Sequence, residues 1–159
     1  MPAADPGPVA AELRNASGLA IQLLLNGSIL AIRHGDVLVN QVLGSPLEGG
    51  IGNVYLRQFG AGEIASVPVI GPASASGFHA FPDRASWVGT AGGLEYVCTL
   101  RLAPSDPTWY WTIRLLNRSD APLIADAVLA QDLGLAHEAT VRSSELYTSQ
   151  YIDHTILED

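Results

Sequence analysis

The residues best equipped for chemistry lie close together in the stretch YTSQYIDHT, which occupies residues 147–155. Gln150 carries an amide that both donates and accepts hydrogen bonds, and Asp153 carries a strong acceptor. Tyr151 adds an aromatic plane, and His154 adds a ring whose donor and acceptor roles change with protonation. This dense set of hydrogen-bonding groups is either a polar tail without a role or the approach to a further part of a longer protein.

Several other patterns resemble catalytic or metal-binding motifs but lack a required part. GAGEIA (60–65) loosely fits the glycine fingerprint of dinucleotide sites, but Pro68 and another expected strand follow where a helix is needed. His137 begins HEATV, in which Val141 replaces the second histidine of a zinc motif, so an exposed polar loop is predicted there. Cys98 lies among apolar residues, which indicates a buried, unreactive thiol. We therefore predict no catalytic residue, no metal ligand and no bound cofactor in this chain.

Composition and charge exclude several classes of function. The chain has 159 residues, a net charge of −8, no lysine and eight scattered arginines, so it lacks the basic face that nucleic acid requires. A single cysteine rules out an intrachain disulfide. Residues 1–16 do not resemble a signal peptide and are predicted to be a disordered leader. No apolar run approaches the roughly 20 residues of a membrane helix, so we expect no membrane insertion and a cytoplasmic location.

Short segments of alternating apolar and polar residues recur along the chain, separated by Gly, Pro, Asn or Asp. This pattern predicts an all-β fold, an antiparallel sandwich or barrel, in one domain from residue 17 to residue 159. Asn26 and Gly27 predict a tight hairpin turn, and Pro68 places its strand at the edge of a sheet. Residues 123–135 indicate strand, with helix as an open alternative. The remaining expected strands are 18–25, two short ones within 29–43, 53–59, 66–71, 85–90, 94–102 and 108–116.

The alternation also predicts which residues face the core. Trp109 and Trp111 share one face of their strand and are predicted to be core residues rather than ligand platforms, whereas Tyr110 faces the surface. The same reasoning predicts further residues on buried faces, namely Leu19, Ile21, Leu23, Leu25, Leu94, Tyr96, Cys98, Leu100, Leu102, Ile113 and Leu115.

Four separate stretches together resemble a known family. They are LNGSILAIRHGDVLVNQVLGSPLEGGIGNVYLR (25–57), TWYWTIRLLNRSDAPL (108–123), LAQDLGLA (129–136) and VRSSELYTSQYIDHT (141–155). The chain resembles the N-terminal domain of the cellobiose-phosphorylase-like glycoside phosphorylases, in the branch of β-1,2-oligoglucan phosphorylase and cyclic β-1,2-glucan synthase. The resemblance runs from about Ser17 to Asp159, and SQYIDH is its most specific part.

The resemblance implies a large β-sandwich of the galactose-mutarotase-like type, a supersandwich, as the first domain of a multidomain enzyme. In this family a helical (α/α)6 barrel follows and carries the catalytic carboxylate and the groups that bind inorganic phosphate, the co-substrate. That barrel is missing from this chain, so the chain alone is expected to be inactive. The parent would be an inverting phosphorylase of β-linked glucans. This domain would close the substrate channel and take part in a homodimer.

The resemblance also suggests a role for the polar stretch, because sugars are bound by polar groups that match hydroxyls and by aromatic faces. In a regular strand, Gln150 and His154 would lie on one side, and Tyr151 and Asp153 on the other. We predict that Tyr151 and Asp153 face a glucan, because an aromatic plane beside an acceptor suits a glucose ring. The alternative, that these side chains satisfy backbone groups at a domain junction, stays open. Two other functions remain possible, a stand-alone carbohydrate-binding module and an interaction scaffold without a ligand.

Overall fold

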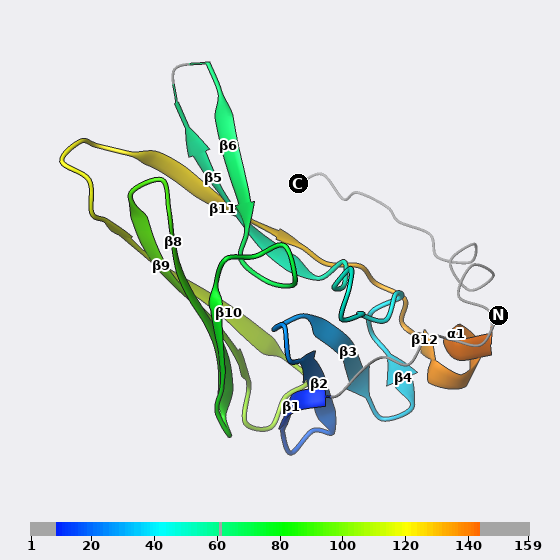
Figure 1. The fold of residues 1–159 in the computed structure, drawn as a ribbon. Helices are drawn as coiled ribbons and strands as arrows, with labels where there is room; N and C mark the ends of the chain where they lie inside the picture. The colour runs from blue at the N-terminus through cyan, green and yellow to red at the C-terminus, as the bar shows by residue number, and fades with distance from the viewer. Residues whose placement is uncertain (1–8, 61, 144–159) are drawn as a thin grey trace, which may run out of the picture.

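The computed structural model describes residues 9–60 and 62–143, which form strands and one short helix (Figure 1). In chain order the elements are β1 (Val9–Arg14), β2 (Leu19–Leu24), β3 (Ile29–His34), β4 (Val37–Leu38), β5 (Asn53–Phe59), β6 (Ile64–Pro68), β7 (Gly77–Ala80), β8 (Arg84–Ala91), β9 (Leu94–Leu102), β10 (Trp109–Asn117), β11 (Ile124–Ala130), β12 (Ala136–His137) and α1 (Glu138–Ser143).

The strands form three antiparallel sheets. The first has the order β1-β2-β3-β4-β12, the second β10-β9-β8-β7 and the third β11-β5-β6. Within the described residues these sheets do not close into a barrel, and the architecture is that of an open β-sandwich. The predicted all-β antiparallel fold is therefore confirmed. Residues 124–130 are a strand and not a helix, because they pair along their whole length with β5.

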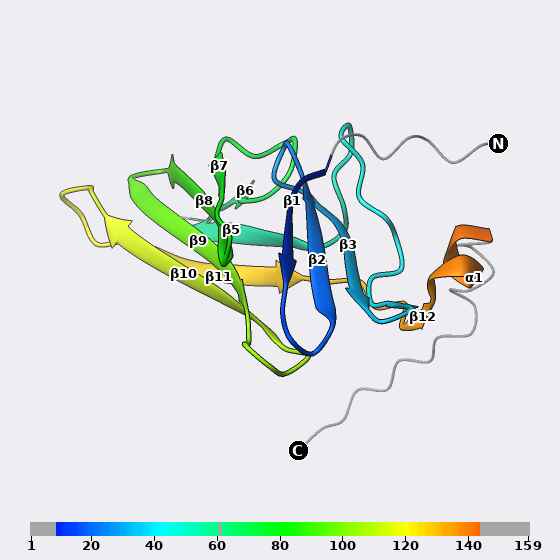
Figure 2. The same cartoon turned by 90° about the horizontal axis from the view of Figure 1, so that it is seen from below.

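One apolar core holds the three sheets together. It combines Ile21 and Ile32 from the first sheet, Trp87 and Leu100 from the second, and Leu56 from the third. Each of these side chains is at most 1% exposed. Burying one such side chain contributes roughly 1.5–3 kcal/mol, so the shared core fixes how the sheets pack. The view from below shows β1, β2 and β3 side by side, with the strands of the other two sheets to one side (Figure 2).

A smaller cluster covers the opposite face of the first sheet. It contains Leu24, Leu30, Ala31 and Leu38 from the strands, and Val141 from α1. The predicted exposed loop at HEATV is therefore wrong, because burying Val141 against this sheet gives the segment a reason to form a helical turn. No helix among residues 9–60 and 62–143 has the length and apolar character that crossing a membrane requires.

The strand alternation predicts the buried faces of β9 and of most of β10. In β9, Leu94, Tyr96, Cys98 and Leu100 are buried as predicted. In β10 the predicted core residues Trp109, Trp111 and Ile113 pack against the core, and Tyr110 is 54% exposed. Strands β2 and β3 are buried on both faces and show no alternation. Two predicted core residues are exposed, because the chain has left the core there. Leu115 is 40% exposed near the end of β10, and Leu25 is 68% exposed in the turn after β2.

The boundary of the leader also differs from the prediction. Residues up to 16 were expected to be disordered, but β1 pairs with β2 along Val9–Arg14. Leu13 lies opposite Ile21 in this pairing and is 2% exposed, so burial of Leu13 explains why these residues form a strand. The short strand β7 was also missed. The strand expected at 85–90 is β8, whereas the one expected at 66–71 is β6, which begins two residues earlier and ends at Pro68. Strand β6 lies at the edge of its sheet, as Pro68 predicted.

Ion pairs tie α1 to the first sheet and lead to a pH-dependent prediction. Glu138 accepts hydrogen bonds from Arg33 Nε and Nη2 at 2.8 and 3.0 Å, and from Arg142 Nε at 2.8 Å. These bonds, above all those from Arg33, lower the pKa of Glu138 from 4.5 to about 2. Because the folded state holds the carboxylate ionised, this contribution to stability is present above pH 4.5 and is lost as the pH falls toward 2.

We expect Glu138→Gln to lower the free energy of unfolding by roughly 1 kcal/mol near neutral pH and to have no effect once the pH falls below about 2. Urea unfolding at a series of pH values measures the difference. Glu95→Gln is the control, since Glu95 forms an exposed pair with Arg118. A Glu138→Gln effect that stays constant down to pH 2 would contradict the assignment.

Candidate functional site

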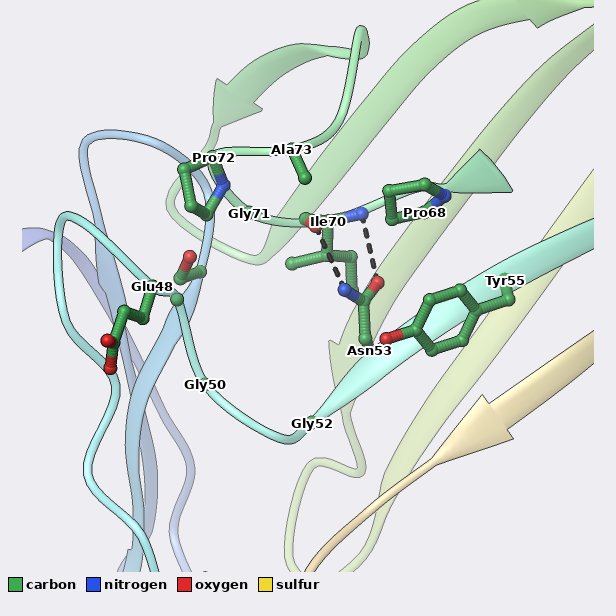
Figure 3. A pocket seen from close by; sticks show the side chains of 12 residues that line it. Glu48, Gly50, Gly52, Asn53, Tyr55, Pro68, Ile70, Gly71, Pro72 and Ala73 are labelled. Atoms are coloured by element: carbon green, nitrogen blue, oxygen red, sulfur yellow. Dashed lines mark hydrogen bonds between the residues drawn. The ribbon is translucent and has the colours of Figure 1, made fainter. Parts of the chain in front are cut away.

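The predicted site residues Gln150, Tyr151, Asp153 and His154 lie outside the described residues. The described part of the chain contains another candidate, a pocket at the junction of the first and third sheets (Figure 3). Its volume is about 200 Å³. The lining comes from the turn after β2, the loop after β4, the start of β5, and the end of β6 with its following loop. The lining residues are Ser28, Glu48, Gly49, Gly50, Gly52, Asn53, Tyr55, Pro68, Ile70, Gly71, Pro72 and Ala73.

Hydrogen bonds fix the loops around this pocket. The amide of Asn53 donates to Ile70 O at 3.0 Å and accepts from Ile70 N at 3.1 Å, which joins β5 to the loop after β6. Asn26 Nδ2 donates to Pro46 O at 2.9 Å and joins the β2–β3 turn to the loop after β4. Gly44 N donates to Leu30 O at 2.9 Å. These hydrogen bonds hold the loops that line the pocket in fixed positions relative to one another.

Ser28 is the unusual polar group of the pocket. It is 1% exposed, and among the described residues its Oγ has no hydrogen-bond partner. Gly49 and Gly71 lie beside it with φ angles of 77° and 87°, and a Cβ added at either would come within 3.1 Å of Ser28 Oγ. Only glycine combines this backbone conformation with the absence of a side chain. The two glycines therefore allow the loops to pack closely around the hydroxyl.

The rest of the lining is apolar or uncharged apart from the rim. Figure 3 shows the Tyr55 phenol directed toward Asn53 and Gly52, and the Glu48 carboxylate directed away from the cavity. Among residues 9–60 and 62–143, no Arg or His lines the pocket. This arrangement can bind a small neutral molecule that offers hydroxyl groups to Ser28 and C–H groups to the rings of Tyr55 and Pro68.

The pocket continues onto the outer face of the third sheet. Strand pairing places Val128, Tyr55 and Pro68 in one row across β11, β5 and β6. The next row on this face holds Arg57 and Asp126, joined by two hydrogen bonds of 2.8 and 2.5 Å. These bonds lower the pKa of the Asp126 carboxyl. The opposite face of the sheet carries Val54 and Leu56 of the core, so this outer face is free of the core.

An apolar row ends the same face. Ile124, Phe59 and Ile64 lie opposite one another on the three strands. Their side chains are 71%, 37% and 60% exposed, respectively. The outer face of the third sheet thus carries three successive features. They are the pocket at Tyr55, the ion pair of Arg57 and Asp126, and the exposed apolar row that contains Phe59.

The other reactive or cavity-lining groups that the structure describes do not form a site. Cys98 is buried as predicted, and burial raises the pKa of its thiol to about 12, which disfavours the reactive thiolate. A hollow next to Asn15 is larger, about 370 Å³, but the Asn15 amide already bonds Ala103 O, Asp106 O and local groups. Another hollow includes Glu138, which is paired with two arginines. The described residues contain no group of three or more His, Cys, Asp or Glu that could hold a metal ion.

Sequence reasoning missed the residues of the pocket. A partial signal was present, because Gly49, Gly50 and Gly52 crowd into four positions and Tyr55 lies on the face opposite the core residues of its strand. Such glycines indicate a close backbone approach but do not say which loop approaches. The burial of Ser28 has no local signature.

Comparison with known proteins finds a matching family and a related enzyme. A family model described as the SOGP N-terminal domain matches residues 22–159. The chain is also 29% identical over 147 residues to a 1,2-beta-oligoglucan phosphorylase of Listeria innocua serovar 6a. That alignment covers 92% of this chain and 13% of the relative, so the chain spans a small part of the relative's length.

Proposed function

Because the chain belongs to the SOGP N-terminal domain family, we propose that it is the N-terminal β-sandwich domain of an enzyme that phosphorolyses β-1,2-linked glucans. The observation that carries this proposal is the alignment of 92% of the chain with a phosphorylase whose name specifies that substrate. The resemblance seen in the sequence supports the same parent, a glycoside phosphorylase with a separate helical catalytic domain.

In the proposed reaction inorganic phosphate replaces water. A general acid protonates the glycosidic oxygen while phosphate attacks the anomeric carbon, and the configuration of that carbon is inverted. A general acid needs a carboxyl whose pKa is raised toward the working pH. In this chain Glu138 and Asp126 have lowered pKa values, and Asp132 accepts hydrogen bonds from the N–H groups of Gln41 and Val42 at 2.8 Å. These three carboxylates make structural hydrogen bonds, and the proposal places the general acid in the helical domain of the parent enzyme.

We further propose that the domain helps to close the glucan channel of the parent and to form its homodimer. The exposed row of Ile124, Phe59 and Ile64 supports a contact with another domain, because neighbouring apolar side chains on a surface commonly mark an interface. The segment with Tyr151 and Asp153 would border the catalytic domain and the glucan in this arrangement.

The complete product of the gene is expected to release sugar phosphate from β-1,2-linked oligoglucan, whereas the chain of residues 1–159 releases none. Sugar phosphate is assayed with and without inorganic phosphate, and cellobiose serves as the control for linkage. Activity of the isolated chain that a point mutation within it abolishes would contradict the proposal. So would a complete gene product that binds β-glucan and cleaves none, which would favour a carbohydrate-binding module.

A further inference from the structure

We propose that the pocket beside Ser28 and Tyr55 binds a single uncharged sugar unit, a glucosyl residue of a β-linked glucan. The choice of sugar rests on the proposed function. The existence of a small-ligand site rests on the pocket itself, and nothing in the sequence pointed to these residues as a group.

The first argument is the hydroxyl of Ser28. A buried polar group without a partner destabilises the folded state, so native proteins keep few of them. Ser28 Oγ is such a group among the described residues, and it lines the cavity. Gly49 and Gly71 approach this hydroxyl closely, and a Cβ on either would come within 3.1 Å of it. A ligand hydroxyl that reaches Ser28 Oγ at the wall of the pocket would satisfy it both as donor and as acceptor.

The second argument is the shape of the apolar lining. Tyr55 and Pro68 are direct neighbours across β5 and β6, and Pro72 and Ala73 lie on the other side of the opening (Figure 3). A sugar ring offers hydroxyls at its edge and C–H groups on its faces. Ser28 would hydrogen-bond a hydroxyl at the edge of the sugar ring. The rings of Tyr55 and Pro68 would pack against the C–H groups on one face of that ring. The volume of about 200 Å³ suits one small ring rather than a longer chain within the pocket itself.

The third argument is charge. The lining residues in the described part of the chain include no basic side chain, and the carboxylate of Glu48 is directed away from the cavity (Figure 3). A phosphate or another anion would lose its hydration without gaining a cation, so the pocket disfavours it. A neutral polyhydroxyl ligand meets no such penalty. The outer face continues past Tyr55 to Arg57 and Asp126, whose charged groups could contact the next unit of a glucan.

The test is a titration of the isotope-labelled 159-residue chain followed by backbone amide NMR. The probes are D-glucose, a β-1,2-linked glucose disaccharide and inorganic phosphate. We expect both sugars to shift the amides of Ser28, Gly49, Gly50 and Gly71, and phosphate to leave them unchanged. Ser28→Ala should weaken sugar binding about fivefold, the loss of one hydrogen bond. Tyr55→Ala should weaken it about tenfold.

Two matched controls accompany these variants. Tyr110→Ala removes an exposed tyrosine of β10, and Ser86→Ala removes a buried serine whose Oγ lies 3.4 Å from Thr99 Oγ1. Neither should change sugar binding. A second readout is thermal: Ser28→Ala should raise Tm by about 2–4 °C, because it removes an unsatisfied buried hydroxyl, and Ser86→Ala should not.

Sugar-induced shifts confined to other residues, or none at all in the folded chain, would overturn the inference. So would phosphate-induced shifts at the pocket amides, or a Ser28→Ala variant that binds sugar as the parent chain does. The proposed function fails separately. If the complete gene product phosphorolyses β-1,2-glucan while the pocket binds no sugar, the sugar site is wrong and the proposed function stands. If the pocket binds glucose while that product is inactive, the proposed function is wrong and the sugar site stands.

Discussion

Trp87→Ala is expected to lower the free energy of unfolding by about 3–5 kcal/mol, the usual range for removing a large aromatic side chain from a core. Trp87 is 1% exposed, and its ring centroid lies 5.5 Å from those of Phe78 and Trp111. It packs within the core that joins all three sheets. A loss of this size is a large fraction of the 5–15 kcal/mol that stabilises a typical domain, so much of the variant should unfold on mild heating.

Urea unfolding followed by circular dichroism measures this loss, and Trp87→Phe is the matched control. The indole N–H of Trp87 has no partner among the described residues, so phenylalanine gives up ring volume but no hydrogen bond. We expect Trp87→Phe to cost about 1–2 kcal/mol. Equal losses for the two variants would show that the N–H and not the packing stabilises the site, contrary to the structure.

Gly44→Ala is expected to cost about 3 kcal/mol, at the upper end of the range for overpacking a core. A Cβ at this position would overlap the carbonyl oxygen of Ile29 and would lie 3.0 Å from Ile29 C and 3.1 Å from Leu30 Cα. All three atoms belong to the backbone of β3, so no side chain can rotate away. The hydrogen bond from Gly44 N to Leu30 O holds the two segments at this distance.

The matched control is Gly60→Ala, where an added Cβ would meet its nearest neighbour, Glu63 O, at an ordinary 3.8 Å. Thermal unfolding should separate the two variants clearly, with Gly60→Ala close to the parent chain. Gly50 also faces Ile29 O, so the loop after β4 lies against β3 at both glycines. Displacing this loop should therefore also abolish sugar binding at the pocket. A Gly44→Ala variant with unchanged stability would show that the loop does not pack as described.

The elements of the fold were largely predictable because each carries its own local pattern. The alternation in residues 94–102 predicted β9 and its buried face, and the alternation in 109–116 predicted that Trp111 packs toward the core. Asn26 and Gly27 predicted the hairpin turn between β2 and β3, where Gly27 has a φ of 77°. Segments with weak local patterns were not predictable. Helix α1 has a single buried residue, Val141, and so shows no helical periodicity.

The exact limits of the elements depended on packing. Leu13 belongs to a strand because Ile21 lies opposite it, and Leu25 is exposed because the strand has already ended. Neither fact can be derived from the period of the pattern, which says how a residue faces within a strand but not where the strand stops.

The sequence by itself determined the fold class, the central core positions and a family resemblance that the comparison supports. These follow from period-two alternation and turn residues, which act within a few positions of the chain. Only the tertiary structure decided the pocket. Ser28, Tyr55 and Gly71 are far apart in sequence, and they meet because the core packs the first and third sheets together. A buried hydroxyl becomes a candidate ligand group only when distant loops close around it, and that closure is a property of long-range packing.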